Sequence, residues 1–329
     1  MNTIPSKGTF ARARHVSQLS SFFSFRLTFF LAISAYSGHI LAQEDAPDVV
    51  TSAARTAQAV TDAQNSTTVI TRTHIESAST SDVVSLLRQQ VGITIRQNGT
   101  SGSVTSIGIR GGEPQHTLVL LDGMPLSSLS AGTAAIEQIP LALIDRIEVV
   151  RGNVSALYGS QATGGLIQIF TRQAQSGSKA DVRLAIGDKG QRQASVQMTT
   201  GNEKVQLAAG IAHTYENAIS ARNSATANPD KDDYRNNSGN ISVRFTPNET
   251  NEFGVRFFET QGRKAYDKLY GANSEQYNKT KVQQISAYSN NQLTERWSSQ
   301  FKVAQMLDRA DDYDSQPYSG SGRSLKKKK

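Results

Sequence analysis

The sequence predicts an α+β domain followed by about seven strands of an antiparallel transmembrane β-barrel. Residues 66–174 mix short apolar runs with helical segments, whereas apolar residues recur at every second position from about residue 180. The later strands are joined by short turns at one end and mostly by longer polar loops at the other. A mean hydropathy of -0.42 argues against membrane-spanning helices, which need runs of about 20 apolar residues.

Charge and composition exclude several classes of function. The formal net charge is +7, but residues 1–42 hold four basic residues and no acid, and residues 326–329 are four lysines. Without these charges, residues 43–325 carry a net charge of -1, which argues against binding to nucleic-acid phosphates. The chain has no cysteine, which excludes disulfides, thiolate catalysis and cysteine-based zinc sites.

Residues 1–42 have the order of a secretory signal peptide. Residues 1–26 are basic and rich in serine, LTFFLAISAY at 27–36 is apolar, and ILA precedes the first acids of the chain. The apolar run is too short to span a bilayer. We therefore expect export, with cleavage after Ala42. A buried N-terminal helix is the alternative interpretation.

The exported part begins with a leader, residues 43–65, of small and polar residues around one apolar pair, Val49-Val50. This composition predicts a flexible segment. Residues 66–174 then form one compact domain with an apolar core. TTVITR is its first predicted strand, and Ser81 or Asp82 can cap a short helix, DVVSLLRQQ, that ends at Gly92.

The rest of this domain is predicted to be rich in strands. The candidates are ITI, SIGIRG, HTLVLLDGMPL with a Gly-Met-Pro turn, RIEVVRG and GGLIQIFTR, which are short apolar runs near glycine or proline. NVSALYGS is predicted as a helical turn. Pro140 suits the first position of a short helix, PLALID, where an amide hydrogen is not needed.

The alternating part of the chain predicts half-exposed strands with one apolar face. The expected strands are 180–187, 191–200, 204–215, 239–246, 252–260, 281–289 and 297–307. Connections 201–203, 247–251 and 290–296 are short, as is 188–190, whereas loops 216–238 and 261–280 are long. This layout is typical of outer-membrane barrels. A soluble β-sandwich also has alternating strands, but it would bury bulky apolar residues on the face that is small or polar here.

Several motifs of the first domain resemble the plug of TonB-dependent outer-membrane receptors. They are IRG at 109–111, LLDG at 120–123, IEVVRG at 147–152, LYGS at 157–160 and GGLI at 164–167, in the order and spacing of the family. Their glycines also suit tight turns with positive φ, which is compatible with the resemblance. The resemblance implies a transporter in the outer membrane of a Gram-negative bacterium.

A short stretch ahead of the plug resembles the TonB box of the same family. It comprises Asp48, Val49, Val50, Thr51 and Ser52. An extended apolar stretch in a flexible leader can add as a strand to the sheet edge of a partner. The resemblance implies that this partner is TonB of the inner-membrane energy complex. An apolar pair without a function is the alternative.

Within the family, the chain is most similar to the cobalamin transporters, from the box to about residue 310. This resemblance implies a cobalamin-like substrate bound by apical plug loops at 96–103 and 126–132. The candidate substrate-binding residues are Gln97, Asn98, Ser101, Ser103, Ser127 and Ser130. Short polar side chains suit a ligand rich in amides. Ordinary solvated loop residues are the alternative.

The same resemblance implies calcium as a cofactor, bound by aspartates of two long barrel loops. The matching residues are Asp230, Asp232 and Asp267. Calcium prefers six to eight oxygen ligands, and the spacing is not that of an EF-hand. One aspartate of the family pattern has no counterpart near residues 216–218. A solvated acidic loop is therefore the alternative.

Two further expectations concern the plug and the absence of catalysis. Arg110 and Arg151 are candidates for ion pairs that lock the plug to the barrel. After removal of the signal, only His74, His116 and His213 remain, and they are scattered. The sequence has no Walker loop, Rossmann fingerprint or Gly-x-Ser-x-Gly motif, so we expect no enzymatic activity.

The resemblance also implies a barrel of about 22 strands, of which this chain supplies about seven. We regard residues 175–310 as a partial barrel and residues 311–329, which end in four lysines, as an aberrant tail. An open sheet leaves unpaired edges that a bilayer cannot satisfy, so we expect no transport by this chain alone. A ferric-siderophore or haem receptor is the second interpretation, and a soluble exported binding module is the third.

Overall fold

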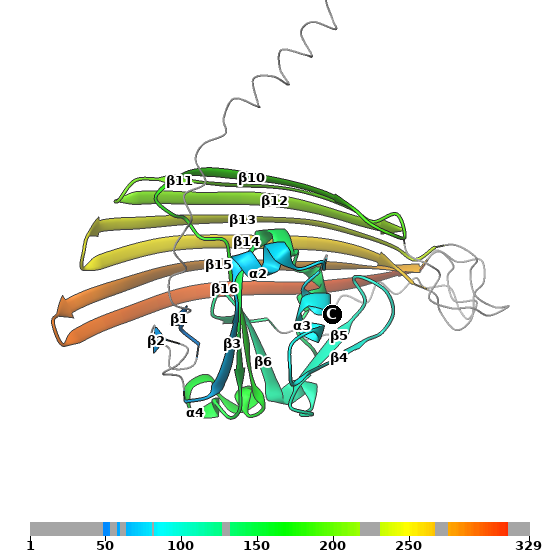
Figure 1. Ribbon diagram of the computed structural model, residues 1–329, viewed down its shortest axis with the longest axis horizontal. Coiled ribbons are helices and arrows are strands. Elements are labelled where there is room, and N and C mark those ends of the chain that lie inside the picture. Colours follow the sequence, from blue (N-terminus) through cyan, green and yellow to red (C-terminus); the bar gives the residue numbers. More distant parts are fainter. Residues whose placement is uncertain are drawn as a thin grey trace, which may run out of the picture. The chain divides into compact units, whose positions relative to one another are not determined.

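The computed structural model describes residues 49–52, 58–59, 64–80, 82–126, 132–217, 231–266 and 276–314. The chain divides into two compact units, residues 1–46 and 47–329, and every described residue lies in the second (Figure 1). The expected signal peptide, Asp48, Ser81, Ser127, Ser130, Asp230, Asp267 and residues 315–329 lie outside the described residues.

A five-stranded sheet forms the centre of the first domain. Its strands, in spatial order, are β3 (Ser66–Ile70), β8 (Ile144–Arg151), β9 (Gly165–Thr171), β6 (Thr117–Leu121) and β7 (Met124–Pro125). The pair β6 and β9 is parallel, and the other pairs are antiparallel. Both β6 and β9 are buried along their whole length, which explains why their sequences are continuous apolar runs rather than alternating ones.

The tight hairpin of this sheet lies one residue earlier than the predicted Gly-Met-Pro turn. Leu121 pairs with Met124, so the turn is Asp122-Gly123. Both residues have positive φ, 47° and 81°, as a type I′ turn requires. The Asp122 carboxylate, which is buried, accepts hydrogen bonds from the Thr171 amide at 3.0 Å and the Thr171 hydroxyl at 2.6 Å. The turn is thereby fastened to the end of β9.

Short helices and a small hairpin surround this sheet. They are α2 (Arg72–Ser77), α3 (Val83–Arg88), α4 (Ser155–Tyr158), the 3₁₀ turns η2 (Pro114–His116), η3 (Ile136–Gln138), η4 (Leu141–Leu143) and η5 (Ser160–Ala162), and the strand pair β4 (Ile93–Gln97) and β5 (Thr105–Ile109). The predicted cap is confirmed, because the Asp82 carboxylate accepts the Ser85 amide at 2.8 Å. The prediction for PLALID is corrected: Pro140 caps a 3₁₀ turn rather than beginning a helix.

The apolar core lies between the helices and the sheet. Leu87, Leu143, Ile147 and Ile169 are fully buried, and they belong to one cluster. Each side chain of this size contributes about 1.5–3 kcal/mol when it leaves water. Phe258, from the second sheet, belongs to the same cluster, so the two sheets share apolar contacts.

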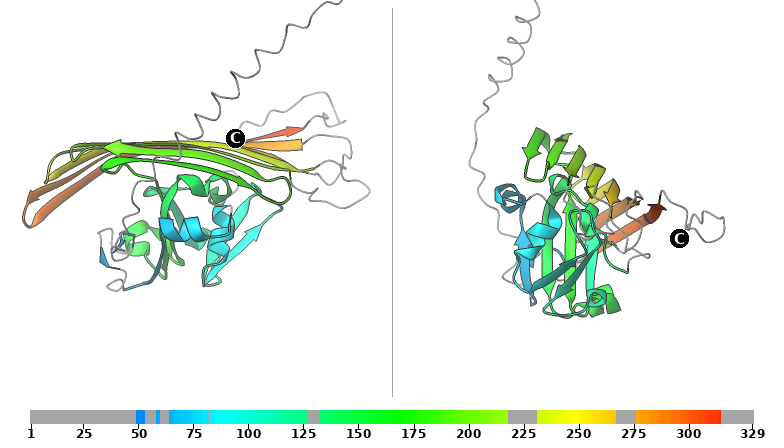
Figure 2. Two further views of the ribbon diagram at one scale, coloured as in Figure 1. Left: turned by 45° about the horizontal axis from the view of Figure 1, so that its top comes forward. Right: turned by 90° about the vertical axis from the view of Figure 1, so that its right-hand side faces the viewer.

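The second sheet has seven antiparallel strands in sequence order, as predicted. They are β10 (Gly177–Ile186), β11 (Arg192–Gly201), β12 (Val205–Asn217), β13 (Asp233–Asn248), β14 (Asn251–Ala265), β15 (Gln276–Thr294) and β16 (Trp297–Asp314). The first domain lies against one face of this curved sheet (Figures 1 and 2). None of the helices among the described residues has the length and apolar character needed to cross a membrane.

Several strands reach further toward the long connections than predicted. β13 begins at Asp233 rather than 239, and β16 continues past residue 310 to Asp314. These ends are polar on both faces, so they show no apolar alternation. Cross-strand contacts hold them instead: the Tyr277 and Tyr313 rings stack at 4.8 Å, and the Asn278 amide donates to Asp312 at 2.8 Å. Residues 311–314 therefore belong to the sheet and not to a tail.

The two faces of the seven-stranded sheet differ in chemistry. Asn236, Asn240 and Ser242 are buried on the face toward the first domain. Ile241, between them in sequence, is 49% exposed on the opposite face. This agrees with the prediction of one small or polar face and one apolar face, as in a barrel whose apolar side faces lipid.

Candidate functional site

The stretch that resembles a TonB box is docked on the first domain. Val49–Val50 form β1, which pairs with β2 (Gln58–Ala59), and the Val50 side chain is completely buried. The Ser52 side chain is also buried, with 1% of its surface exposed. We refer to residues 49–52 as the box segment. Its docking departs from the prediction of a flexible leader at these positions.

One carboxylate, that of Glu148 on β8, holds the box segment. Glu148 Oε2 accepts the backbone amide of Thr51 at 3.0 Å and that of Ser52 at 2.8 Å. Its Oε1 accepts the Thr51 hydroxyl at 3.3 Å and Arg146 Nε at 3.0 Å. The side chain has no exposed surface. Hydrogen bonds to a charged acceptor contribute about 1.5–3 kcal/mol each, so this carboxylate is the main anchor of the segment.

The second anchor is Gln168 on β9. Its Oε1 accepts the Ser52 hydroxyl at 3.0 Å, and Gln168 lies directly opposite Glu148 in the β8–β9 ladder. Sequence reasoning missed both residues. The available signal was a polar residue in the middle of each apolar strand, in RIEVV and LIQIF. A buried polar side chain in such a run needs a partner, and here the box segment supplies it.

The apical loop of the first domain packs against the seven-stranded sheet. Lys264 Nζ donates to Thr100 Oγ1 at 2.5 Å, and a side chain at Gly102 would overlap the Tyr234 ring. Only some of the predicted substrate residues line a pocket at this contact. Gln97 and Ser101 line a small pocket, whereas Asn98 and Ser103 are outside its lining.

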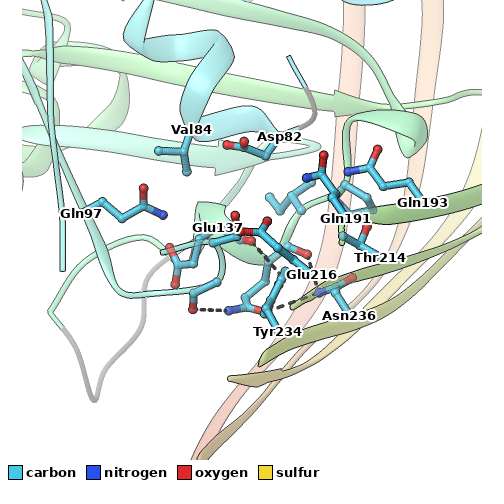
Figure 3. Close-up of a pocket in the computed structure, with 15 residues that line it drawn as sticks. Asp82, Val84, Gln97, Glu137, Gln191, Gln193, Thr214, Glu216, Tyr234 and Asn236 are labelled. Carbon is cyan, nitrogen blue, oxygen red and sulfur yellow. Dashed lines mark hydrogen bonds between the residues drawn. The ribbon is translucent and has the colours of Figure 1, made fainter. Parts of the chain in front are cut away.

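This pocket lies between the first domain and strands β11 to β13 (Figure 3). Asp82, Glu137 and Glu216 contribute carboxylates to it, and Tyr234 contributes a hydroxyl that donates to the Glu137 carbonyl at 3.1 Å. Its volume of about 30 Å³ has room for one or two water molecules. As it stands, the pocket is far too small for a corrinoid or a siderophore.

Burial raises the pKa of Glu137 from 4.5 to about 8, and the nearby Asp308 acts in the same direction. Glu137 Oε2 is buried and has no hydrogen-bonding partner among the described residues. The folded chain therefore holds a proton that the unfolded chain releases between about pH 4.5 and 8. Its stability should fall as the pH rises through that window.

We predict that Glu137→Gln flattens this pH dependence, because an amide mimics the protonated acid. The test is the thermal unfolding midpoint of the full chain at pH 5 and pH 8. The decrease between these values should be smaller in the variant, with Glu113→Gln, at an exposed position, as the control. Equal decreases in all three proteins would contradict the prediction.

The described residues do not assemble the predicted calcium site. Asp232 is almost fully buried, and its carbonyl accepts Lys264 Nζ at 2.9 Å. Among the described residues, no group of three or more histidine, aspartate or glutamate side chains is arranged to hold a metal ion. Asp230 and Asp267 lie outside those residues, so the calcium site stays a prediction.

The two candidate lock arginines have different surroundings. Arg151 is buried, and it donates to the Val91 carbonyl at 2.9 Å and to Thr68 Oγ1 at 2.8 Å, both within the first domain. Burial, together with the charge of Arg110, lowers the pKa of Arg151. Arg110 is exposed, with a φ of 52°. Their pairing with barrel residues stays a prediction.

Contacts that sequence reasoning did not find join the first domain to the sheet at Gln138. Its carbonyl accepts Thr260 Oγ1 at 2.8 Å and Asn236 Nδ2 at 3.1 Å. On another strand, Lys302 Nζ donates to the Asp122 carbonyl at the β6–β7 turn. None of these three contacts is an ion pair, because each acceptor is a backbone carbonyl. A pattern of opposite charges in the sequence could therefore not have indicated them.

Comparison with known proteins gives a family match for the first domain and a likeness of fold for the rest of the described chain. Residues 59–166 match a family described as the TonB-dependent Receptor Plug Domain. Residues 59–166 are therefore similar to the plug domain of TonB-dependent receptors, and the strands that follow have the fold of part of a receptor barrel. Such receptors are non-enzymatic transporters of the Gram-negative outer membrane, which agrees with the predicted class, location and lack of catalysis.

Three solved structures illustrate the likeness of fold. The ferric yersiniabactin uptake receptor of Yersinia pestis is 18% identical with a TM-score of 0.64, over 75% of this chain and 41% of its own. The ferripyoverdine receptor of Pseudomonas aeruginosa is 15% identical with a TM-score of 0.67, over 80% and 37%. The copper transporter OprC is 17% identical with a TM-score of 0.60, over 75% and 37%. The chain thus spans less than half the length of each.

Proposed function

We propose that this chain is part of a receptor for active uptake across the outer membrane, driven by TonB through the box segment, and that it does not transport a substrate by itself. The observation that supports this proposal is the docking of Thr51 and Ser52 on Glu148, beside the buried Val50. Held by side chains at a domain surface, a short extended segment can exchange those contacts for the sheet edge of a partner. The match to a TonB-dependent receptor plug domain supports TonB as that partner.

For the substrate we propose cobalamin or a related corrinoid. The support is the resemblance to cobalamin transporters from the box to about residue 310, including both apical stretches. Gln97, Asn98, Ser101, Ser103, Ser127 and Ser130 would contact it, and Asp230, Asp232 and Asp267 would bind calcium in the loops above. The pocket beside Gln97 and Ser101 would have to widen, or the ligand would bind outside it.

A ferric siderophore is the second candidate. Two of the three structures above are described as receptors for ferric yersiniabactin and ferripyoverdine. At identities of 15–18% these likenesses concern the fold alone, so they keep the candidate open without favouring one siderophore.

The absence of cysteine allows a clean test of the TonB contact. Thr51→Cys in the full chain is mixed with the periplasmic domain of TonB carrying a single cysteine. We expect a disulfide at residue 51 and none with Gln64→Cys, an exposed control outside the box segment. Equal yields at both positions, or none at residue 51, would refute the proposed partner.

The substrate is tested by binding to outer membranes that contain the full chain. Cyanocobalamin with and without calcium, ferripyoverdine and ferric yersiniabactin are compared in the same membranes. Calcium-dependent retention of cyanocobalamin supports the first candidate. Retention of a ferric siderophore alone overturns it in favour of the second.

A further inference from the structure

Cationic side chains gather on the outward face of the seven-stranded sheet, near the long loops. They are Arg235, Arg263, Lys279, Lys281 and Arg309, and all five line one surface depression across β13 to β16. The ladder register brings them together. Arg235 lies opposite Arg263, Arg263 opposite Lys279, and Lys281 opposite Arg309. We call this group the cationic patch.

The patch keeps an excess of positive charge after its ion pairs are counted. Asp233 pairs with both Arg235 at 2.9 Å and Arg263 at 2.6 Å. Glu259 pairs with Lys281 at 3.1 Å, and Asp311 pairs with Arg309 at 2.7 Å. Among the described residues, five cations therefore face three carboxylates. Like charges held on adjacent strands repel one another, so a bound anion would reduce the repulsion between these cations.

Three cations of the patch lie close to tyrosine rings. Lys279 Nζ lies 5.6 Å from the Tyr277 ring centre and 5.1 Å from that of Tyr313. Asp311, which forms an ion pair with Arg309, lies opposite Lys279 in the ladder. Arg263 stacks on Tyr277 at 4.4 Å, and Arg235 lies 5.4 Å from Tyr215. Tyrosines on the outward face of a barrel mark the level of the membrane interface.

An apolar surface begins on the same face immediately beyond the patch. Ile241, Phe257 and Ile285 are neighbours in one row across the sheet, followed by Val243 and Val255 in the next. Ile285 is four residues from Lys281 along β15, which is about 13 Å in a strand. Ile285 is 50% exposed. One lipid molecule can thus contact the cations with its headgroup and this row with an acyl chain.

The position of the patch also selects the leaflet. The patch lies at the end of the sheet that carries the long connections, 218–230 and 267–275, and long connections lie on the outside of such barrels. We propose that the cationic patch binds the phosphate groups of a multiply phosphorylated lipid of the outer leaflet. The arginine side chains would bind phosphate oxygens in bidentate fashion, and the lysines would act as point charges.

The proposal is tested with the full chain extracted from outer membranes. Native mass spectrometry compares the retention of bisphosphorylated lipid A, monophosphorylated lipid A and inorganic phosphate. The test variant is Lys279→Gln with Lys281→Gln. The control is Lys204→Gln with Arg296→Gln, which removes the same charge at exposed positions of the short turns. Protease resistance of the sheet shows that each variant is folded.

We expect the test variant to bind bisphosphorylated lipid A at least tenfold more weakly, and the control to bind it like the unmodified chain. Lys279→Arg with Lys281→Arg should restore binding, which separates a charge effect from misfolding. Equal retention of both lipids, or equal binding by the test variant, would overturn the proposal. Occupancy by inorganic phosphate that prevents lipid binding would refute the assignment to a lipid.

Discussion

Replacing Glu148 with alanine is expected to release the box segment from the plug. The change removes the acceptor of the Thr51 and Ser52 amides and leaves both donors without a partner at a buried site. Losing such charge-assisted hydrogen bonds should cost at least about 2 kcal/mol, or roughly a thirtyfold rise in the released population. Glu148→Gln, which keeps one acceptor oxygen, should have a smaller effect.

Hydrogen exchange of the amides of residues 50–52 measures this release. Glu113→Ala is the matched control, because Glu113 is exposed on the same domain and its side chain caps no helix. Exchange in the control should equal that of the unmodified chain. The amides of β9 report on the plug as a whole, so faster exchange there would mean general unfolding instead of local release. Unchanged exchange at residues 50–52 in Glu148→Ala would contradict the anchor role.

Gly165→Ala is expected to destabilise the plug more than any glycine substitution at an open turn. Gly165 begins β9 with a φ of 152°, and an added Cβ would lie 2.5 Å from the Val150 carbonyl and 2.7 Å from Ile109 Cδ1. The carbonyl belongs to the β8 backbone, which is paired on both sides and cannot move aside. Backbone strain and overpacking together should lower the free energy of unfolding of the plug by about 3 kcal/mol or more.

Gly111→Ala provides the comparison, since it shares a positive φ, 76°, but has open space around it. Only the conformational cost applies there, about 1 kcal/mol. Exchange of β8 and β9 amides within the full chain measures both variants without separating the plug from the sheet. If the two substitutions had equal effects, the close approach of Val150 would not explain the glycine.

The sequence was most informative where one local rule determined the structure. Ser81 or Asp82 was predicted to cap the helix, because a side-chain oxygen ahead of an apolar helical run can accept its first amides, and Asp82 is the residue that does so. The seven strands followed from alternation over the part of the sheet that has one exposed apolar face. Their polar ends were missed because both faces there are hydrophilic, as at Tyr313 and Asp312. Helix α2 was missed because it buries only Ile75 and so shows no periodicity.

The site was less predictable because it depends on pairing across the chain. Residues 48–52 were singled out by position, but their anchors Glu148 and Gln168 come from the fold of β8 against β9. The parallel pair β6 and β9 joins Thr117 to Gly165, although strands β7 and β8, helix α4 and three 3₁₀ turns lie between them in the chain. No local pattern specifies such a contact. The same holds for Gln138, whose role is set by strands that follow it.

The order of strands in the plug sheet has a mechanical consequence. The leader enters the sheet at Ser66 in β3, an edge strand that pairs only with β8. Tension on the box segment would reach β2 and then β3, and the short ladder of β3 can separate without breaking the pairs between β8, β9 and β6. Strand β9 is the last of the plug and leads directly into β10. The sheet would therefore lose β3 first, while β9 stays paired with β8 and β6. Because β9 continues into β10, the released part of the plug would stay attached to the seven-stranded sheet.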